Sequence, residues 1–162
     1  MLFSDAHAYS KVGQPVGSSV GTYASPEPDK FLPKNAILDY IKSYFAEDSK
    51  SSCKPNPKLL DAISNILIDL QNKGWDPKVV ELCRTEAQQR EKVEKGYSQT
   101  MHSKHLRGRA VDIVDKRYWW EIPTSHQFWK DLGIACKKQE LIWGGDWKGF
   151  LDVAHCEMTE DQ

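Results

Sequence analysis

Apolar residues recur at helical spacing in the first half of the chain and as short runs in the second half. We expect one helix from Lys34 to Phe45, and a second that has Asn56 as its cap, Pro57 at its first position and a stop at Gly74. Further along, the pattern predicts strands at 79–83, 110–114, 141–143 and 153–158, and helices at 85–95 and 124–138. Helices early and short strands late predict an α+β domain, with a small, mainly antiparallel sheet flanked by helices.

Residues 1–33 do not share this pattern, because Gly, Ser and Pro are scattered through them with little periodicity. We expect this segment to be an extended N-terminal arm or linker, and residues 34–162 to form a single domain. A chain of 162 residues buries about 70% of the surface that its unfolded form exposes, so a core forms without disulfides or metals.

Charge and hydropathy exclude several classes of protein. The net charge of −1 argues against a nucleic-acid partner, since such proteins normally carry a clear basic excess. No apolar stretch approaches the roughly 18 to 20 residues that span a bilayer. The first residues, MLFSDAH, have neither a basic nor an apolar signal region, so we expect synthesis in the cytoplasm without a signal peptide, and a monomer.

The four cysteines are widely separated and contain no C-x-x-C pair, which disfavours a zinc site made of cysteine alone. They are Cys53, Cys83, Cys136 and Cys156. Two disulfides are possible in an oxidising compartment, and the sequence cannot choose among the three full pairings. The favoured interpretation is that all four are small buried hydrophobic residues.

Asp112 interrupts an otherwise apolar strand, and a buried carboxylate is costly unless a metal, a cation or hydrogen bonds compensate it. His105 lies seven residues earlier, with Gly108 between them permitting a sharp turn. Asp152 and His155 flank the start of another short strand. Two histidines and an aspartate can form a three-ligand zinc site that leaves the fourth position to water. Taken singly, each residue is more often a surface group or an ion-pair partner, so this spacing alone is a weak signal.

Three ordered blocks carry a resemblance to a known family. Residues 103–112, SKHLRGRAVD, resemble the S-x-H-x-x-G-x-A-x-D signature of the zinc D-alanyl-D-alanine carboxypeptidase and L-alanyl-D-glutamate peptidase family. Residues 143–147, WGGDW, followed by D-x-x-H at 152–155, are similar to its second block. Cys-Arg-Thr at 83–85 with Gln89 resembles its Y-R-S-x-x-x-Q block. The resemblance covers about half of the chain and is strongest to the phage endolysin branch.

The resemblance implies one Zn²⁺ per chain, held by His105, Asp112 and His155. It implies that Asp152 is the general base, which accepts a proton from water and passes it to the leaving amine. Arg84 would stabilise the oxyanion that develops on the scissile carbonyl.

For Gln89 and Ser103 the resemblance implies either contact with the substrate or support of the side chains around the metal, and a substrate contact is also expected at Asp146. The chain also departs from the family pattern, since Cys83 stands where an aromatic residue is frequent and Cys156 where Phe is usual. Neither change falls on an expected ligand or on the base.

The activity implied is hydrolysis of an amide bond in the stem peptide of bacterial peptidoglycan, as an L-alanyl-D-glutamate endopeptidase of the endolysin type. A D-alanyl-D-alanine carboxypeptidase and an injected antibacterial toxin of the same fold are alternatives. A peptidoglycan-binding module without catalysis is an alternative of another class. The protein would act on the cell wall in the periplasm after release or delivery.

Overall fold

The computed structural model describes residues 33, 36–37, 39, 41 and 53–161. The arm expected at 1–33 lies, apart from its last residue, outside the described residues, so the division of the chain at residue 33 stays a prediction. Within the helix expected at 34–45, the described residues 36, 37, 39 and 41 are all helical.

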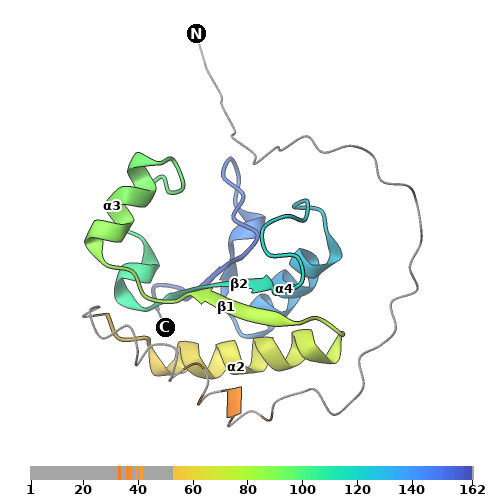
Figure 1. Ribbon diagram of the computed structural model, residues 1–162. Helices are drawn as coiled ribbons and strands as arrows, with labels where there is room; N and C mark the ends of the chain where they lie inside the picture. The colour runs from red at the N-terminus through yellow and green to blue at the C-terminus, as the bar shows by residue number, and fades with distance from the viewer. Residues whose placement is uncertain (1–32, 34–35, 38, 40, 42–52, 162) are drawn as a thin grey trace.

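The main described elements are a four-stranded sheet and the helices that flank it (Figure 1). The sheet has the strand order β1-β2-β4-β3 and every pairing in it is antiparallel. Its strands are β1 (Pro77–Glu81), β2 (Ala110–Asp115), β3 (Ile142–Trp143) and β4 (His155–Glu157). The helices are α2 (Pro57–Asn72), α3 (Glu86–Glu94) and α4 (Gln127–Lys138), with short 3-10 helices η2 (Lys104–Arg107) and η3 (Gly144–Asp146). This architecture confirms the α+β prediction.

Helices α2 and α4 contact each other, and they also contact β1 and β3 respectively. Figure 1 shows α2 running along β1 and β2, while α3 stands at the end of the molecule away from α4. The apolar faces of α2 and α4 meet the sheet in one core, which Ile37 and Ile41 join. Among the described residues, no helix is long and apolar enough to cross a membrane.

Local sequence signals set the helix ends. The side chain of Asn56 accepts a hydrogen bond from the backbone N–H of Lys58 and caps α2. Thr85 and Gln88 form a capping box at the start of α3, in which each side chain accepts a hydrogen bond from the other residue's backbone N–H. Helix α4 begins three residues later than expected, because the side chain of His126 caps it.

The strand ends also differ slightly from the prediction. Strand β1 begins at Pro77, two residues earlier than expected, because Pro77 already pairs with Asp115. Strand β4 begins at His155 and not at Val153, since the preceding backbone bends back to hydrogen-bond η3. Shifts of this size are common, because sequence patterns locate element ends poorly.

The cysteines divide into two kinds, which corrects the interpretation that all four are buried hydrophobic residues. Cys136 and Cys156 are buried free thiols. Cys53 and Cys83 instead form a disulfide between the chain just before α2 and the loop after β1, with their Cα atoms 5.7 Å apart. The sequence could not show this pairing, because it depends on how β1 passes the start of α2.

Gly108 makes the turn that joins η2 to β2. Its φ of 61° is left-handed, and a Cβ atom there would lie 2.4 Å from the carbonyl oxygen of Lys54. The carbonyl oxygen of Gly108 accepts a hydrogen bond from the backbone N–H of Asn56. The turn is therefore possible only for glycine, on grounds of both conformation and space.

Gly108→Ala is expected to destabilise the protein more than Gly96→Ala. Both glycines have positive φ, but a Cβ atom at Gly96 would meet nothing within 4 Å. Gly96→Ala should cost about 1–2 kcal/mol of unfolding free energy for the left-handed conformation alone. Gly108→Ala should cost about 1–3 kcal/mol more, because the new methyl group meets backbone. Urea denaturation of the two variants checks this, and equal losses would contradict it.

Candidate metal centre

Three buried side chains from separate segments converge at one end of the sheet. His105 comes from η2, Asp112 from β2 and His155 from β4, where the last two face each other in register. Their exposed fractions are 2%, 7% and 5%. The ligand atoms His105 Nε2, Asp112 Oδ1 and His155 Nδ1 are separated by 3.0–3.2 Å.

This triangle has the dimensions of a tetrahedral metal site. With metal–ligand bonds of about 2.0–2.1 Å, two ligand atoms at a tetrahedral angle lie about 3.3–3.4 Å apart. The observed separations of 3.0–3.2 Å are close to that value. Three protein ligands also leave one tetrahedral position open, as in catalytic zinc sites.

The outer nitrogen of each imidazole has an acceptor that fixes its tautomer. His105 Nδ1 lies 3.4 Å from the carbonyl oxygen of Leu82, and His155 Nε2 lies 3.1 Å from Glu157 Oε2. With a metal bound, each outer nitrogen would donate its proton outward, and the two inner nitrogens would offer their lone pairs to the metal beside the carboxylate of Asp112. Three acceptors so close together repel one another unless a cation lies among them, and this donor set fits a divalent metal.

The close contacts within the cluster shift the pKa values of Asp112 and His155. Burial alone would raise the pKa of Asp112, but the two histidines hold it well below its usual range. Burial alone would lower the pKa of His155, but its contacts with Asp112 and Glu157 outweigh burial and raise the pKa to about 10. The site thus favours an anionic carboxylate together with positive charge on or between the imidazoles.

Asp152 lies on the loop before β4, close to the cluster. Its backbone N–H donates to the carbonyl oxygen of Gly144, and its own carbonyl oxygen accepts from the N–H of His155. Burial and then the charge of Asp112 raise the pKa of its carboxyl group. Within the described part of the chain its carboxylate has no hydrogen-bond partner, so it is available to exchange protons.

Comparison with known proteins identifies the family of this chain. A family model described as D-alanyl-D-alanine carboxypeptidase matches residues 96–158, the segment that contains the three converging side chains and Asp152. A crystal structure of the Serratia marcescens L-Ala D-Glu endopeptidase ChiX is similar with 31% identity and a TM-score of 0.53, over 65% of this chain and 80% of that one. The chain belongs to this peptidase family.

A second relative of this chain is the L-alanyl-D-glutamate peptidase of Listeria phage A118. The two are 34% identical over 123 residues, which are 74% of this chain and 43% of the phage protein. The chain therefore spans less than half the length of that curated relative.

Three hydrogen bonds to two neighbouring side chains hold the guanidinium of Arg84. Its Nε and Nη2 donate to both carboxylate oxygens of Glu81, and its Nη1 donates to Gln89 Oε1. Glu81 is opposite Asp112 in the strand register, so this network lies beside the metal cluster. Two of the five guanidinium N–H groups remain without a hydrogen bond among the described residues.

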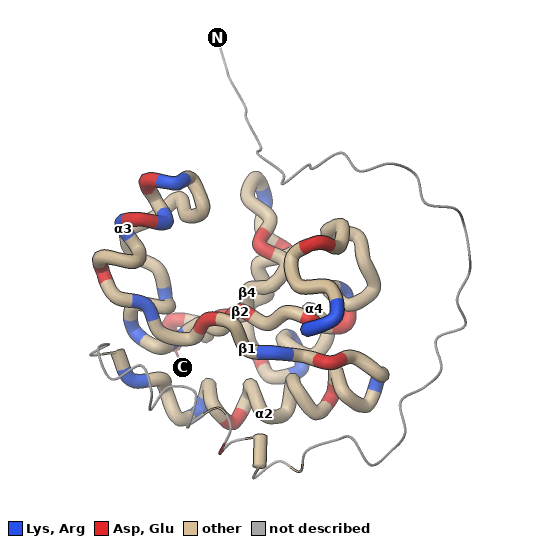
Figure 2. Tube along the Cα trace, viewed as in Figure 1, with Lys and Arg blue, Asp and Glu red and all other residues tan. Residues whose placement is uncertain are grey.

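Gln89 is fully buried, and its amide nitrogen donates to Ser98 Oγ and to the carbonyl oxygen of Thr100. It is the one buried residue of α3, a helix along which Figure 2 shows acidic and basic residues interspersed. Gln89 thus anchors α3 and positions Arg84.

The other expected substrate contacts lie in different places. Ser103 Oγ accepts a hydrogen bond from the backbone N–H of His105, and with Arg84 it lines an open pocket of about 650 Å³. Asp146 is exposed and pairs with Lys137 of α4 at 3.0 Å. The structure therefore brings Ser103 to the pocket and leaves Asp146 on the outer side of the loop.

Sequence reasoning missed Glu157 and Leu82. Glu157 lies two residues after His155 in β4, so the period of two in a strand places both on the same face. That signal was available in the sequence. The carbonyl oxygen of Leu82 was not, because a backbone group leaves no trace in the residue pattern.

Glu157→Ala is expected to weaken metal binding by about 10- to 100-fold, because His155 loses the acceptor that fixes its tautomer. Glu91→Ala is the control, since the Glu91 side chain is 60% exposed and pairs with Lys95. Competition with a chromophoric chelator measures both affinities. Equal affinities for the two variants would show that Glu157 does not orient the ligand.

Proposed function

We propose that this protein is a zinc peptidase that hydrolyses the L-alanyl-D-glutamate amide bond in the stem peptide of bacterial peptidoglycan. The observation that carries the proposal is the convergence of two imidazole nitrogens and one carboxylate beside Asp152. The two relatives named for L-alanyl-D-glutamate cleavage support the choice of bond.

Zinc is the metal that this donor set favours. Two imidazole nitrogens and one carboxylate oxygen in a tetrahedral arrangement suit Zn²⁺, whereas Mg²⁺ and Ca²⁺ prefer six or more oxygen ligands. In such a site a bound zinc ion polarises a carbonyl group and lowers the pKa of water to about 7. His105, Asp112 and His155 would hold it.

Asp152 would move the proton. A general base must reach the water it deprotonates and must titrate near the working pH. Asp152 meets the second condition better than an exposed aspartate, because burial and the charge of Asp112 raise its pKa. We infer that it accepts a proton from the attacking water and returns it to the departing amine.

Arg84 would stabilise negative charge on the carbonyl oxygen as the tetrahedral intermediate forms. Because Glu81 and Gln89 already hold the guanidinium, it is positioned before the reaction and needs little reorganisation. The pocket that Arg84 and Ser103 line is open, and Arg107 and Glu86 also line it. Its two arginines suit an extended peptide with carboxylates.

Defined muropeptides test the proposed substrate. With zinc-loaded protein we expect fragments that end in L-alanine and fragments that begin with D-glutamate, and no fragments after a chelator is added. Mass spectrometry distinguishes these from free D-alanine, which would indicate a D-alanyl-D-alanine carboxypeptidase. Binding of muropeptides without any cleavage would indicate a binding module.

Asp152→Asn is expected to lower kcat by about 100- to 10 000-fold, because the amide cannot accept the proton. Zinc content should stay near one per chain, whereas Asp112→Ala should lose both zinc and activity. Asp69→Asn is the control, since Asp69 pairs with Lys138 on the outer surface. Loss of zinc from a folded Asp152→Asn protein would contradict the assignment of Asp152 as the base.

A further inference from the structure

The short helix η2 carries His105 and is capped by the side chain of Ser103. It is a single 3-10 turn of four residues, Lys104–Arg107, and such turns have poor internal hydrogen-bond geometry. Its position therefore depends on its surroundings, and besides Ser103 and β2 two chain segments hold it.

One of these segments is the end of β1 and the loop after it. The carbonyl oxygen of Leu82 faces His105 Nδ1, and the backbone N–H of Arg84 donates to the carbonyl oxygen of His105 at 3.1 Å. Cys83 lies between these two residues. The same three-residue segment therefore sets both the ring orientation and the backbone position of the ligand.

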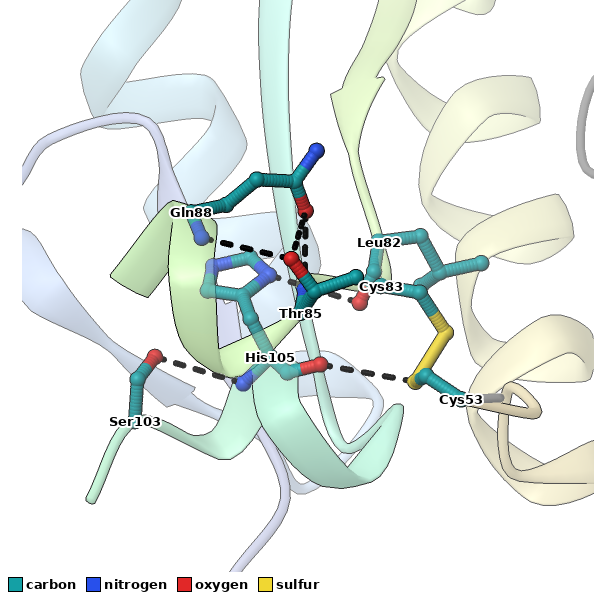
Figure 3. The surroundings of a disulfide bond; sticks show 7 residues. All are labelled: Cys53, Leu82, Cys83, Thr85, Gln88, Ser103 and His105. Atoms are coloured by element: carbon teal, nitrogen blue, oxygen red, sulfur yellow. Dashed lines mark hydrogen bonds between the residues drawn. A yellow bond between two sulfur atoms is a disulfide. The ribbon is translucent and has the colours of Figure 1, made fainter. Parts of the chain in front are cut away.

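The other segment is the chain that leads into α2. The backbone N–H of Asn56 donates to the carbonyl oxygen of Gly108 at 2.9 Å, and the Cys53 sulfur lies 3.5 Å from the carbonyl oxygen of His105. Since a disulfide sulfur carries no proton, that second contact is van der Waals packing. Figure 3 shows η2 beside the bond between Cys53 and Cys83.

We propose that the Cys53–Cys83 disulfide is a clamp that positions His105 for metal binding, so that the metal affinity of the protein depends on its redox state. The bond joins the two segments that hold η2, and it closes a sequence separation of 30 residues. This inference rests on the proposed function, because it assigns His105 as a metal ligand.

Opening the clamp is ordinary thiol–disulfide exchange. A dithiol breaks the sulfur–sulfur bond, the two cysteines become thiols, and the dithiol is oxidised to its own disulfide. The segments 53–56 and 82–84 then separate more easily, and η2 loses its fixed support. In a reducing compartment the chain would hold zinc weakly, and in an oxidising compartment tightly.

The rate of zinc release into a chromophoric chelator tests the clamp. Four samples are compared: oxidised wild type, wild type reduced with a trialkylphosphine, the double variant C53S/C83S, and oxidised Leu67→Ala. The phosphine takes oxygen from one water molecule to become the phosphine oxide, and it is removed by gel filtration under argon before the assay. Leu67 is buried in α2 outside both clamp segments, so its variant controls for lost stability.

We expect zinc to leave the reduced wild type and C53S/C83S at least tenfold faster than oxidised wild type and Leu67→Ala. Far-UV circular dichroism at the assay temperature shows which samples remain folded. Equal release from oxidised and reduced wild type overturns the clamp, and so does release from Leu67→Ala as fast as from C53S/C83S. An oxidised wild type that binds no zinc would instead overturn the proposed function.

Discussion

The structure depends on an arrangement that is unfavourable without a cation. Two imidazole nitrogens and a carboxylate oxygen lie within 3.0–3.2 Å of one another in a buried place. Burying the carboxylate of Asp112 costs several kcal/mol of desolvation free energy unless positive charge compensates it. The contacts of His155 with Asp112 and Glu157 raise its pKa to about 10 despite burial, so the cluster attracts positive charge. The antiparallel pairing of β2 with β4 and the turn at Gly108 both serve to assemble it.

The sequence predicted those parts of the fold whose cause is local. The cap at Asn56 and Pro57 at the first helical position are short-range signals, and α2 begins where they place it. The capping box at Thr85, which the structure revealed, is equally local. Asp112 was conspicuous for a similar reason, since a lone carboxylate in an apolar run of five residues is visible without any structure. The shifts at 77 and 155 arose because strand ends depend on pairing partners elsewhere in the chain.

What the sequence could not predict depends on contacts between distant segments. The approach of Asp112 to His155 joins positions 43 residues apart, so the spacing alone could not predict it, and the prediction came from the family resemblance. The choice of Cys83 as the partner of Cys53 was not predicted, because it depends on the path of β1 past α2. Gln89 illustrates a different limit. The family pattern left open whether it touches the substrate or supports another side chain, and its burial and its three polar contacts favour support of Arg84. A pattern of residue types does not distinguish a group that touches a substrate from one that holds another side chain.

The W-G-G-D block at 143–146 is a second case in which the residue pattern does not show what the residues do, and here the role is one of packing. A Cβ atom at Gly145 would lie 2.2 Å from the Trp143 indole, and one at Gly133 of α4 would lie 2.5 Å from it, so the indole is enclosed between the two glycines. Its Nε1 donates to the carbonyl oxygen of Val153 at 2.9 Å, which fixes the loop next to Asp152. A Cβ atom at Gly144 would also clash with the backbone of Asp152. These residues therefore act on the site by fixing the loop that carries Asp152, and the glycine in the middle of α4, unfavourable for a helix by itself, makes room for the indole.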